Sequence, residues 1–242
     1  MRTAIFSGLL LLSVSAYCQT PAQEAAELYR AGQFEQAAQA YEKLAAAEPD
    51  NAYFAYNLGN AYFKLNRLGK AVVCYRRAFE LQPRDQDIRA NLSFAVKKAG
   101  DALVPAGIPE VLHSIYHLLS QKELSGLFWL LCWAALLPGA VCVWPTRRRG
   151  WLLAIALVFA ALASASGIWL LARRTTGLKN PAVVIEAQAE VRAGPGENFS
   201  TAATIPEGHT VEVLESNQGW LLVGVRSKNI QGWVKAAALE RP

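Results

Sequence analysis

Two long apolar stretches, placed back to back, constrain this chain more than any other feature. Residues 124–146 and 150–172 contain no charged side chain, and only the arginines at 147–149 separate them. As helices, each stretch would be ~34 Å long, which is enough to cross a hydrocarbon core of ~30 Å. Buried helices of a soluble core are the alternative, but these rarely run so far without a charge. We therefore predict two transmembrane helices, joined as an antiparallel hairpin by the basic loop.

The N-terminus, residues 1–18, has the layout of an export signal. A basic residue precedes an apolar run, and the small residues Ala16 and Cys18 occupy the positions that a signal peptidase requires. We expect cleavage after Cys18. A lipoprotein signal ending at Cys18 is an alternative, which the bulky Tyr17 disfavours. An uncleaved signal anchor is a second alternative and would give the same topology.

Export determines on which side of the membrane each part lies. It places residues 19–100 and 181–242 outside the cytoplasm and the loop 147–149 inside it. The arginines of this loop agree with the tendency of basic loops to remain cytoplasmic. Arg173 and Arg174, on the outer flank, do not agree. Charge alone therefore leaves the orientation open, and the export signal decides it.

Residues 21–98 repeat with a period of 34. The aligned pairs are Gly32 with Asn66, Phe34 with Leu68, Ala37 with Ala71, Tyr41 with Tyr75, and Pro49 with Pro83. The pattern resembles the tetratricopeptide repeat, in which small residues let paired helices approach, aromatic residues fill the space between them and proline ends the second helix. The first repeat has Ala25 and Leu44 where the second has Gly59 and Ala78. We predict repeats at 18–51 and 52–85 and a capping helix at 85–98.

The resemblance implies a concave binding face built from the first helix of each repeat. The matching positions are Tyr29, Arg30, Tyr53, Tyr56, Asn60, Phe63, Lys64, Phe94 and Lys97. An asparagine close to basic side chains is suited to clamping a peptide carboxylate. A solvated face without a fixed ligand is the alternative, because two repeats make only a shallow groove.

The approach to the hairpin has a pattern of its own. Residues 108–119 alternate as an amphipathic helix, which we predict to lie on the membrane surface. Ser120 and Glu123 have capping-box spacing and would start the first membrane helix. His113 and His117 have the spacing that metal sites use, but no further ligand is near, so we predict no metal site.

The hairpin itself lacks the side chains of a transport path. Neither span contains an acid, a base or an amide, which argues against ion transport. Ala156, Ala160, Ser164 and Gly167 form a small-residue face on the second span, and we expect the first span to pack there.

From residue 181 the pattern changes to short runs of alternating residues separated by turns. The runs are 182–187, 189–193, 209–215, 220–225 and 231–235. Such a pattern favours a small β-barrel. Its order of Val191-Arg192-Ala193-Gly194-Pro195, Gly219-Trp220 and Gly232-Trp233 resembles the bacterial SH3 domain, over nearly all of 181–242. Glu190 stands where that family usually has asparagine.

Arg192, Trp220 and Trp233 are the candidate surface residues of this module. The resemblance implies cell-wall peptides or proteins as ligands. The two tryptophans have two interpretations, a binding surface or the core of the barrel. We expect both in the core, because Gly-Trp also completes the strand pattern.

Charge and motifs exclude several classes of function. The net charge of +5 arises mainly beside the apolar spans, where anionic lipid headgroups explain it better than nucleic acid does. The chain has no phosphate-binding glycine loop, zinc-protease motif or nucleophile elbow, and no CxxC pair. We therefore predict no enzyme, no cofactor and no disulfide framework.

The order of the modules extends the resemblance to the whole chain. An export signal, helical repeats, a membrane hairpin and a terminal SH3 module together resemble the BatE-type proteins of the bacterial aerotolerance (Bat) group. This resemblance implies an inner-membrane protein with periplasmic modules. It also implies von Willebrand A-domain and MoxR-type ATPase partners, in a complex linked to oxidative stress or envelope integrity.

The predicted fold class is a multidomain membrane protein with all-α repeats, a transmembrane α-hairpin and a small all-β barrel. Three functions follow from it: an adaptor that binds protein partners, a peptidoglycan-binding or sensing protein, and an accessory that presents a substrate to an enzyme.

Overall fold

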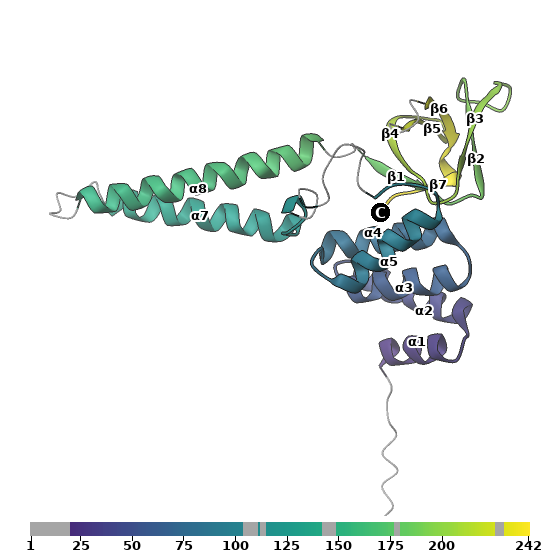
Figure 1. Cartoon of the computed structure of the whole chain (residues 1–242), viewed down its shortest axis with the longest axis horizontal. Helices are drawn as coiled ribbons and strands as arrows, with labels where there is room; N and C mark the ends of the chain where they lie inside the picture. Colours follow the sequence, from purple (N-terminus) through teal and green to yellow (C-terminus); the bar gives the residue numbers. More distant parts are fainter. Residues whose placement is uncertain (1–19, 104–110, 112–114, 142–148, 177–179, 226–229) are drawn as a thin grey trace, which may run out of the picture.

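The computed structural model describes residues 20–103, 111, 115–141, 149–176, 180–225 and 230–242. A helical body carries two attachments (Figure 1). A pair of long helices projects from one side of the body, and a β-barrel packs against another side. The signal sequence predicted at 1–18 and the basic loop at 147–149 lie outside the described residues, except for Arg149.

The helical body contains two antiparallel helix pairs followed by a fifth helix. The helices are α1 (Pro21–Arg30), α2 (Phe34–Ala47), α3 (Ala52–Lys64), α4 (Leu68–Leu81) and α5 (Gln86–Lys98). Thr20, Asn51 and Asp85 cap the starts of α1, α3 and α5 with their side chains. Helices α2 and α4 begin without a side-chain cap.

The residues that recur every 34 positions form the interior of this body. Tyr41 and Tyr75 are 1% and 2% exposed. The ring of Tyr75 packs so closely on α3 that a Cβ at Gly59 would lie 2.7 Å from it. Gly32 and Asn66, an aligned pair, both adopt a positive φ at the turn between paired helices. The period therefore reports both the core and the turns.

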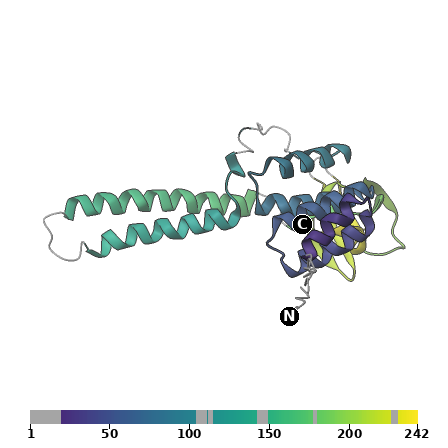
Figure 2. The same ribbon diagram turned by 90° about the horizontal axis from the view of Figure 1, so that it is seen from below.

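Helices α7 (Gln121–Val141) and α8 (Arg149–Thr176) lie side by side over their length (Figure 2). Both are long and apolar enough to cross a membrane. The predicted capping box is present: the Ser120 amide donates to Oε2 of Glu123 at 2.8 Å, and the Glu123 amide donates to Oγ of Ser120 at 3.2 Å. Large apolar side chains cover the outside of the pair, including Trp129 and Trp133.

The contact face of α8 differs in part from the predicted one, because of the predicted residues Gly167 contacts α7 but Ala160 and Ser164 do not lie in the contact. Ala163 and Ser166 are buried, and a Cβ at Gly167 would lie 3.0 Å from the ring of Phe128 on α7. Ala160 and Ser164, which we expected at this contact, are exposed. The observed residues follow the helical spacing of three and four residues, so the stripe is rotated around α8 from the predicted one.

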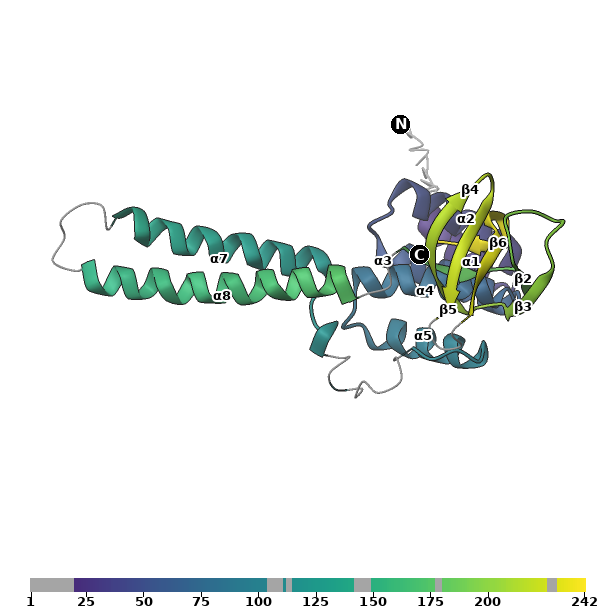
Figure 3. The ribbon, with the colours of Figure 1, turned by 90° about the horizontal axis from the view of Figure 1, so that it is seen from above.

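The start of the helix pair is tied to the repeats. Lys122 forms an ion pair with Asp50 at 2.6 Å, and Glu123 pairs with Arg84. These side chains are exposed, so each pair contributes little stability. They nevertheless place the loops that follow α2 and α4 at the base of the pair (Figure 3).

Only part of the predicted amphipathic helix at 108–119 is described. Val111, Ile115 and Leu118 are exposed apolar residues there. His117, expected on a polar face, instead packs its ring 5.3 Å from that of Phe79 on α4. His113 lies outside the described residues. The described part of this segment therefore contacts the repeats as well as solvent.

The C-terminal module is one antiparallel sheet that curls into a barrel. Its strands are β1 (Pro181–Val184), β2 (Gln188–Arg192), β3 (Thr201–Pro206), β4 (Thr210–Asn217), β5 (Trp220–Val225), β6 (Ile230–Lys235) and β7 (Leu239–Glu240). They are ordered β3-β2-β6-β5-β4-β1-β7. Strands β3 and β7 were not among the predicted runs. The barrel core is aliphatic and includes Val191, Ile205, Val211, Val223 and Val234.

The barrel is not a separate body on a linker. Strand β1 packs on α4, and Val183, which is fully buried, belongs to the same packed cluster as Val72 and Leu92 of the repeats. This contact was not predicted from the sequence.

Burial changes the acid–base properties of the repeat interior. Cys74 on α4 is 6% exposed, and burial raises the pKa of its thiol to about 12 from an ordinary value of 9. Burial is also the main cause that raises the pKa values of Tyr41, Tyr62 and Tyr75. All four groups are therefore held neutral by the fold.

The stability of the repeats should fall in alkali. Above pH 9 the unfolded chain loses the Cys74 proton while the folded chain retains it, so the free energy of unfolding falls as the pH rises toward about 12. Urea unfolding followed by circular dichroism at a series of pH values measures this. Cys74→Ala, which copies Ala40 of the first repeat, should delay the fall toward pH 10, where the tyrosines of the unfolded chain begin to ionise. Identical pH dependence of the two proteins would contradict the assignment.

Candidate functional site

The concave side of the repeats contains a pocket of about 200 Å³. Helices α1, α3, α4 and α5 all contribute to its walls, so the pocket exists only when both repeats and α5 are assembled. The lining residues are Tyr29, Asn60, Phe63, Lys64, Tyr75, Asn91 and Phe94.

A hydrogen-bond network fixes the polar side of the pocket. Oδ1 of Asn60 accepts from the hydroxyl of Tyr75 at 2.8 Å and from Nδ2 of Asn91 at 3.1 Å. Nδ2 of Asn91 also donates to the hydroxyl of Tyr56 at 2.9 Å. Because its oxygen is used in this way, Asn60 has its amide protons to offer a ligand. Together with the ammonium group of Lys64, this makes the polar side of the pocket a hydrogen-bond donor site.

The rest of the pocket is aromatic. The rings of Phe63 and Phe94 meet edge to face, with centroids 5.7 Å apart, and Phe94 is 61% exposed. Nζ of Lys98 lies 4.7 Å from the centroid of the Phe63 ring. Exposed aromatic rings beside fixed amide and ammonium donors suit a peptide that carries both an apolar side chain and a carboxylate.

The structure brings together most of the residues proposed for this face. Tyr29, Asn60, Phe63, Lys64 and Phe94 line the pocket, and Tyr56 lies behind it through Asn91. Arg30, Tyr53 and Lys97 do not line the pocket.

Two pocket residues were missed at the sequence level. Tyr75 was assigned to packing alone, although its hydroxyl reaches Asn60. Asn91 lies one helical turn before Phe94 on α5. The spacing of three residues between Asn91 and Phe94 is the signal that would have found it.

A second candidate surface lies on the barrel, where both tryptophans were expected in the core. That expectation is wrong: Trp220 and Trp233 are half-buried and lie outside the aliphatic core. Side chains alternate along β6, so the buried Val234 sends Trp233 to the outer face. The strand register places Trp233 beside Arg192 of β2.

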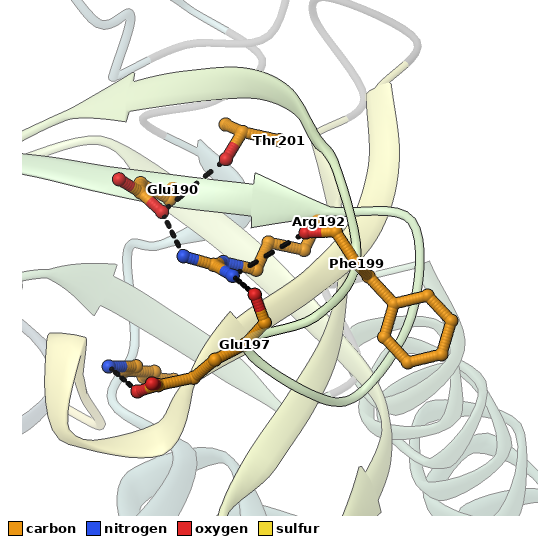
Figure 4. Close-up of polar contacts among 6 residues, drawn as sticks. Glu190, Arg192, Glu197, Phe199 and Thr201 are labelled. Atoms are coloured by element: carbon orange, nitrogen blue, oxygen red, sulfur yellow. Dashed lines mark hydrogen bonds and ion pairs between the residues drawn. The ribbon is translucent and has the colours of Figure 1, made fainter.

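Arg192 holds a loop rather than presenting a free charge (Figure 4). Its guanidinium donates to the carbonyls of Glu197 and Phe199 and, at 2.6 Å, to the carboxylate of Glu190. The same group lies 5.8 Å from the centroid of the Trp220 ring. The Arg192 side chain is 17% exposed. Its contacts therefore fix the loop at 193–200, and its role at this surface is positional.

Lys235 completes this surface. Its Nζ lies 2.7 Å from Oε1 of Glu197 and 5.9 Å from the centroid of the Trp220 ring. Lys235 is the main cause that lowers the pKa of Glu197. The Trp220 ring is thus flanked by two cations whose charges are already balanced by Glu190 and Glu197.

Replacement of Arg192 should release the loop. Arg192→Ala removes charge-assisted bonds to two carbonyls, and we expect a loss of about 1–3 kcal/mol in barrel stability. The amides of residues 193–200 should lose protection from hydrogen exchange, measured by mass spectrometry. Arg241→Ala, at an exposed position, is the control. Unchanged protection in Arg192→Ala would show that the loop does not depend on these bonds.

Comparison with known families agrees with this architecture. Residues 25–66 and 52–85 match two family models described as TPR repeat and tetratricopeptide repeat. Residues 187–240 match the bacterial SH3 domain. No curated protein matches the chain. The chain thus combines two kinds of binding module with two long apolar helices, and none of the matched families is catalytic.

Proposed function

We propose that this protein is a membrane-anchored adaptor whose repeats bind a carboxylate-bearing peptide segment of a partner protein. The pocket on the concave face is the observation that carries the proposal. It has the aromatic rings and the fixed donors of a peptide site, and nothing in the described residues resembles a catalytic constellation.

The charge of this face sets the kind of peptide. Lys64 lines the pocket and Lys98 lies over the ring of Phe63. Arg30 follows Tyr29 at the end of α1, and Lys97 precedes Lys98 at the end of α5. No acidic residue lines the pocket. An acidic segment or a chain terminus is therefore favoured over a basic one.

The helix pair α7/α8 would anchor the adaptor. Its outer surface is apolar, with Trp151, Leu157 and Ile168 more than two-thirds exposed, which suits lipid contact. In this proposal the export signal predicted at 1–18 directs the repeats and the barrel to the periplasm, and the helix pair is the anchor in the inner membrane. A reporter active only in the periplasm should be active when fused after Pro242 and silent when fused after Arg148. The reverse pattern would exclude this topology.

The order of the modules supports a place in a Bat-type complex. The partners would then be von Willebrand A-domain membrane proteins and a MoxR-type ATPase system, and the role would concern oxidative stress or envelope integrity. This part rests on the whole-chain resemblance, whereas the peptide site rests on the pocket.

The pocket on the concave face is tested by reversing a charge in it. Lys64→Glu should reduce crosslinking of a photoreactive residue at position 94 to its partner by about tenfold, because a favourable ion pair becomes repulsive. Crosslinking is done in native membranes, and the products are identified by mass spectrometry. Lys43→Glu, on an exposed part of α2, makes the same charge change and should have no effect. Equal crosslinking in both variants would remove the groove as the binding site.

A second candidate is peptidoglycan binding by the barrel, which the half-buried position of Trp220 outside the barrel core favours. Co-sedimentation of the purified chain with cell-wall sacculi, lost in Trp220→Ala and retained in Lys64→Glu, would support it. Failure of the wild-type chain to sediment would leave the adaptor alone.

A further inference from the structure

The barrel supplies the N-terminal cap that helix α4 lacks. The helix starts at Leu68 without a side-chain cap of its own. Oε1 of Glu207, in the turn between β3 and β4, accepts a hydrogen bond from the amide of Gly69 at 2.7 Å. A carboxylate at the start of a helix satisfies a free amide and interacts favourably with the helix dipole. Glu207 thus caps α4 from another module.

The close approach of the barrel explains the glycine at position 69. A Cβ there would lie 2.3 Å from the carbonyl oxygen of Val184 and 2.8 Å from Cα of Ile185. The aligned position in the first repeat is Glu35, which is exposed. Of these two aligned positions, only the one on α4, which contacts the barrel, is a glycine.

Buried polar groups of the repeats also find their partners in the barrel. Arg76 of α4 is buried, and its Nη2 donates to Oγ1 of Thr210 at 2.7 Å. The amide of Thr210 donates to Oδ2 of Asp101, just after α5, at 2.9 Å. Burial lowers the pKa of Arg76, and the nearby Asp101 opposes this. Thr210 accepts from Nη2, whereas Nε of Arg76 has no hydrogen-bond partner among the described residues. Because a buried guanidinium without acceptors is costly, loss of the barrel would leave Arg76 with fewer acceptors still.

Apolar packing continues across the same boundary. Val183 of β1 is fully buried in a cluster with Val72 of α4 and Val96 of α5. A Cβ at Gly208 would lie 2.6 Å from that of Ala99 at the end of α5. The barrel therefore covers part of α4 and contacts the end of α5.

We propose a second function for the barrel: it covers the last two helices of the repeats and completes the repeat domain. Helices α4 and α5 supply Tyr75, Asn91 and Phe94 to the pocket, so the barrel also maintains the pocket's wall. This role is the barrel's own and requires no ligand in the pocket.

Gly69→Glu is the sharpest test, because it gives α4 the residue of the first repeat. An acidic residue in the first turn favours the isolated helix, so any loss of stability must come from loss of the barrel. Gln36→Glu adds the same charge to the first turn of α2, where the side chain is exposed. It is the matched control.

Two measurements distinguish docking of the barrel from its stabilisation of the repeats. Hydrogen exchange at the Thr210 amide reports docking, because this amide donates across the boundary. Maleimide labelling of the buried Cys74, in the full chain with Cys18, Cys132 and Cys142 replaced by alanine, reports opening of the repeats.

Gly69→Glu should deprotect Thr210 and accelerate Cys74 labelling by about tenfold or more, since local opening controls both rates. Gln36→Glu should match the parent. Glu207→Gln, which adds no bulk, should shift both readouts in the same direction by less. Deprotection of Thr210 with unchanged Cys74 labelling would overturn the proposal, and so would two unchanged readouts.

Discussion

Helix α4 is buried along two sides, and the rest of the structure depends on this. One side packs on α3 through Tyr75, whose ring contacts Gly59. The other side meets the barrel through Gly69 and Arg76. Such a helix needs small residues where its neighbours approach closely. Its buried polar groups need hydrogen-bond partners on other elements. Gly59 and Gly69 allow the close approaches, and Glu207 and Thr210 accept from the start of α4 and from Nη2 of Arg76. These contacts turn two modules that are common as separate domains into one body.

The sequence predicted the parts of the fold that depend on local pattern. The period of 34 predicted the helix pairs, because packing distance is set within each repeat. The aligned residues Gly32 and Asn66 both adopt a positive φ in the structure, which was not predicted. It did not predict the contact of the repeats with the barrel, since that contact joins residues more than a hundred positions apart. Its trace was present only as a difference between repeats, Gly69 in place of Glu35.

The candidate sites show the same division. The concave face was predicted from the family pattern. Asn91 was missed because the position aligned with it in the preceding repeat was not a candidate binding position. The tryptophans of the barrel were assigned to the wrong face. Side chains alternate between the two faces of β6, so only one of Trp233 and Val234 can point into the barrel. Val234 belongs to the aliphatic core of the barrel, and Trp233 does not.

The ion pairs of Lys122 and Glu123 have a consequence for geometry. They bring the loops after α2 and α4 close to the first turn of α7. If α7 and α8 span a bilayer, the repeats then lie near the lipid surface. Binding would then depend on the distance of the partner segment from the membrane as well as on its chemistry. A binding segment far from the membrane would be excluded, whereas the same segment close to the membrane would be met at a high effective concentration.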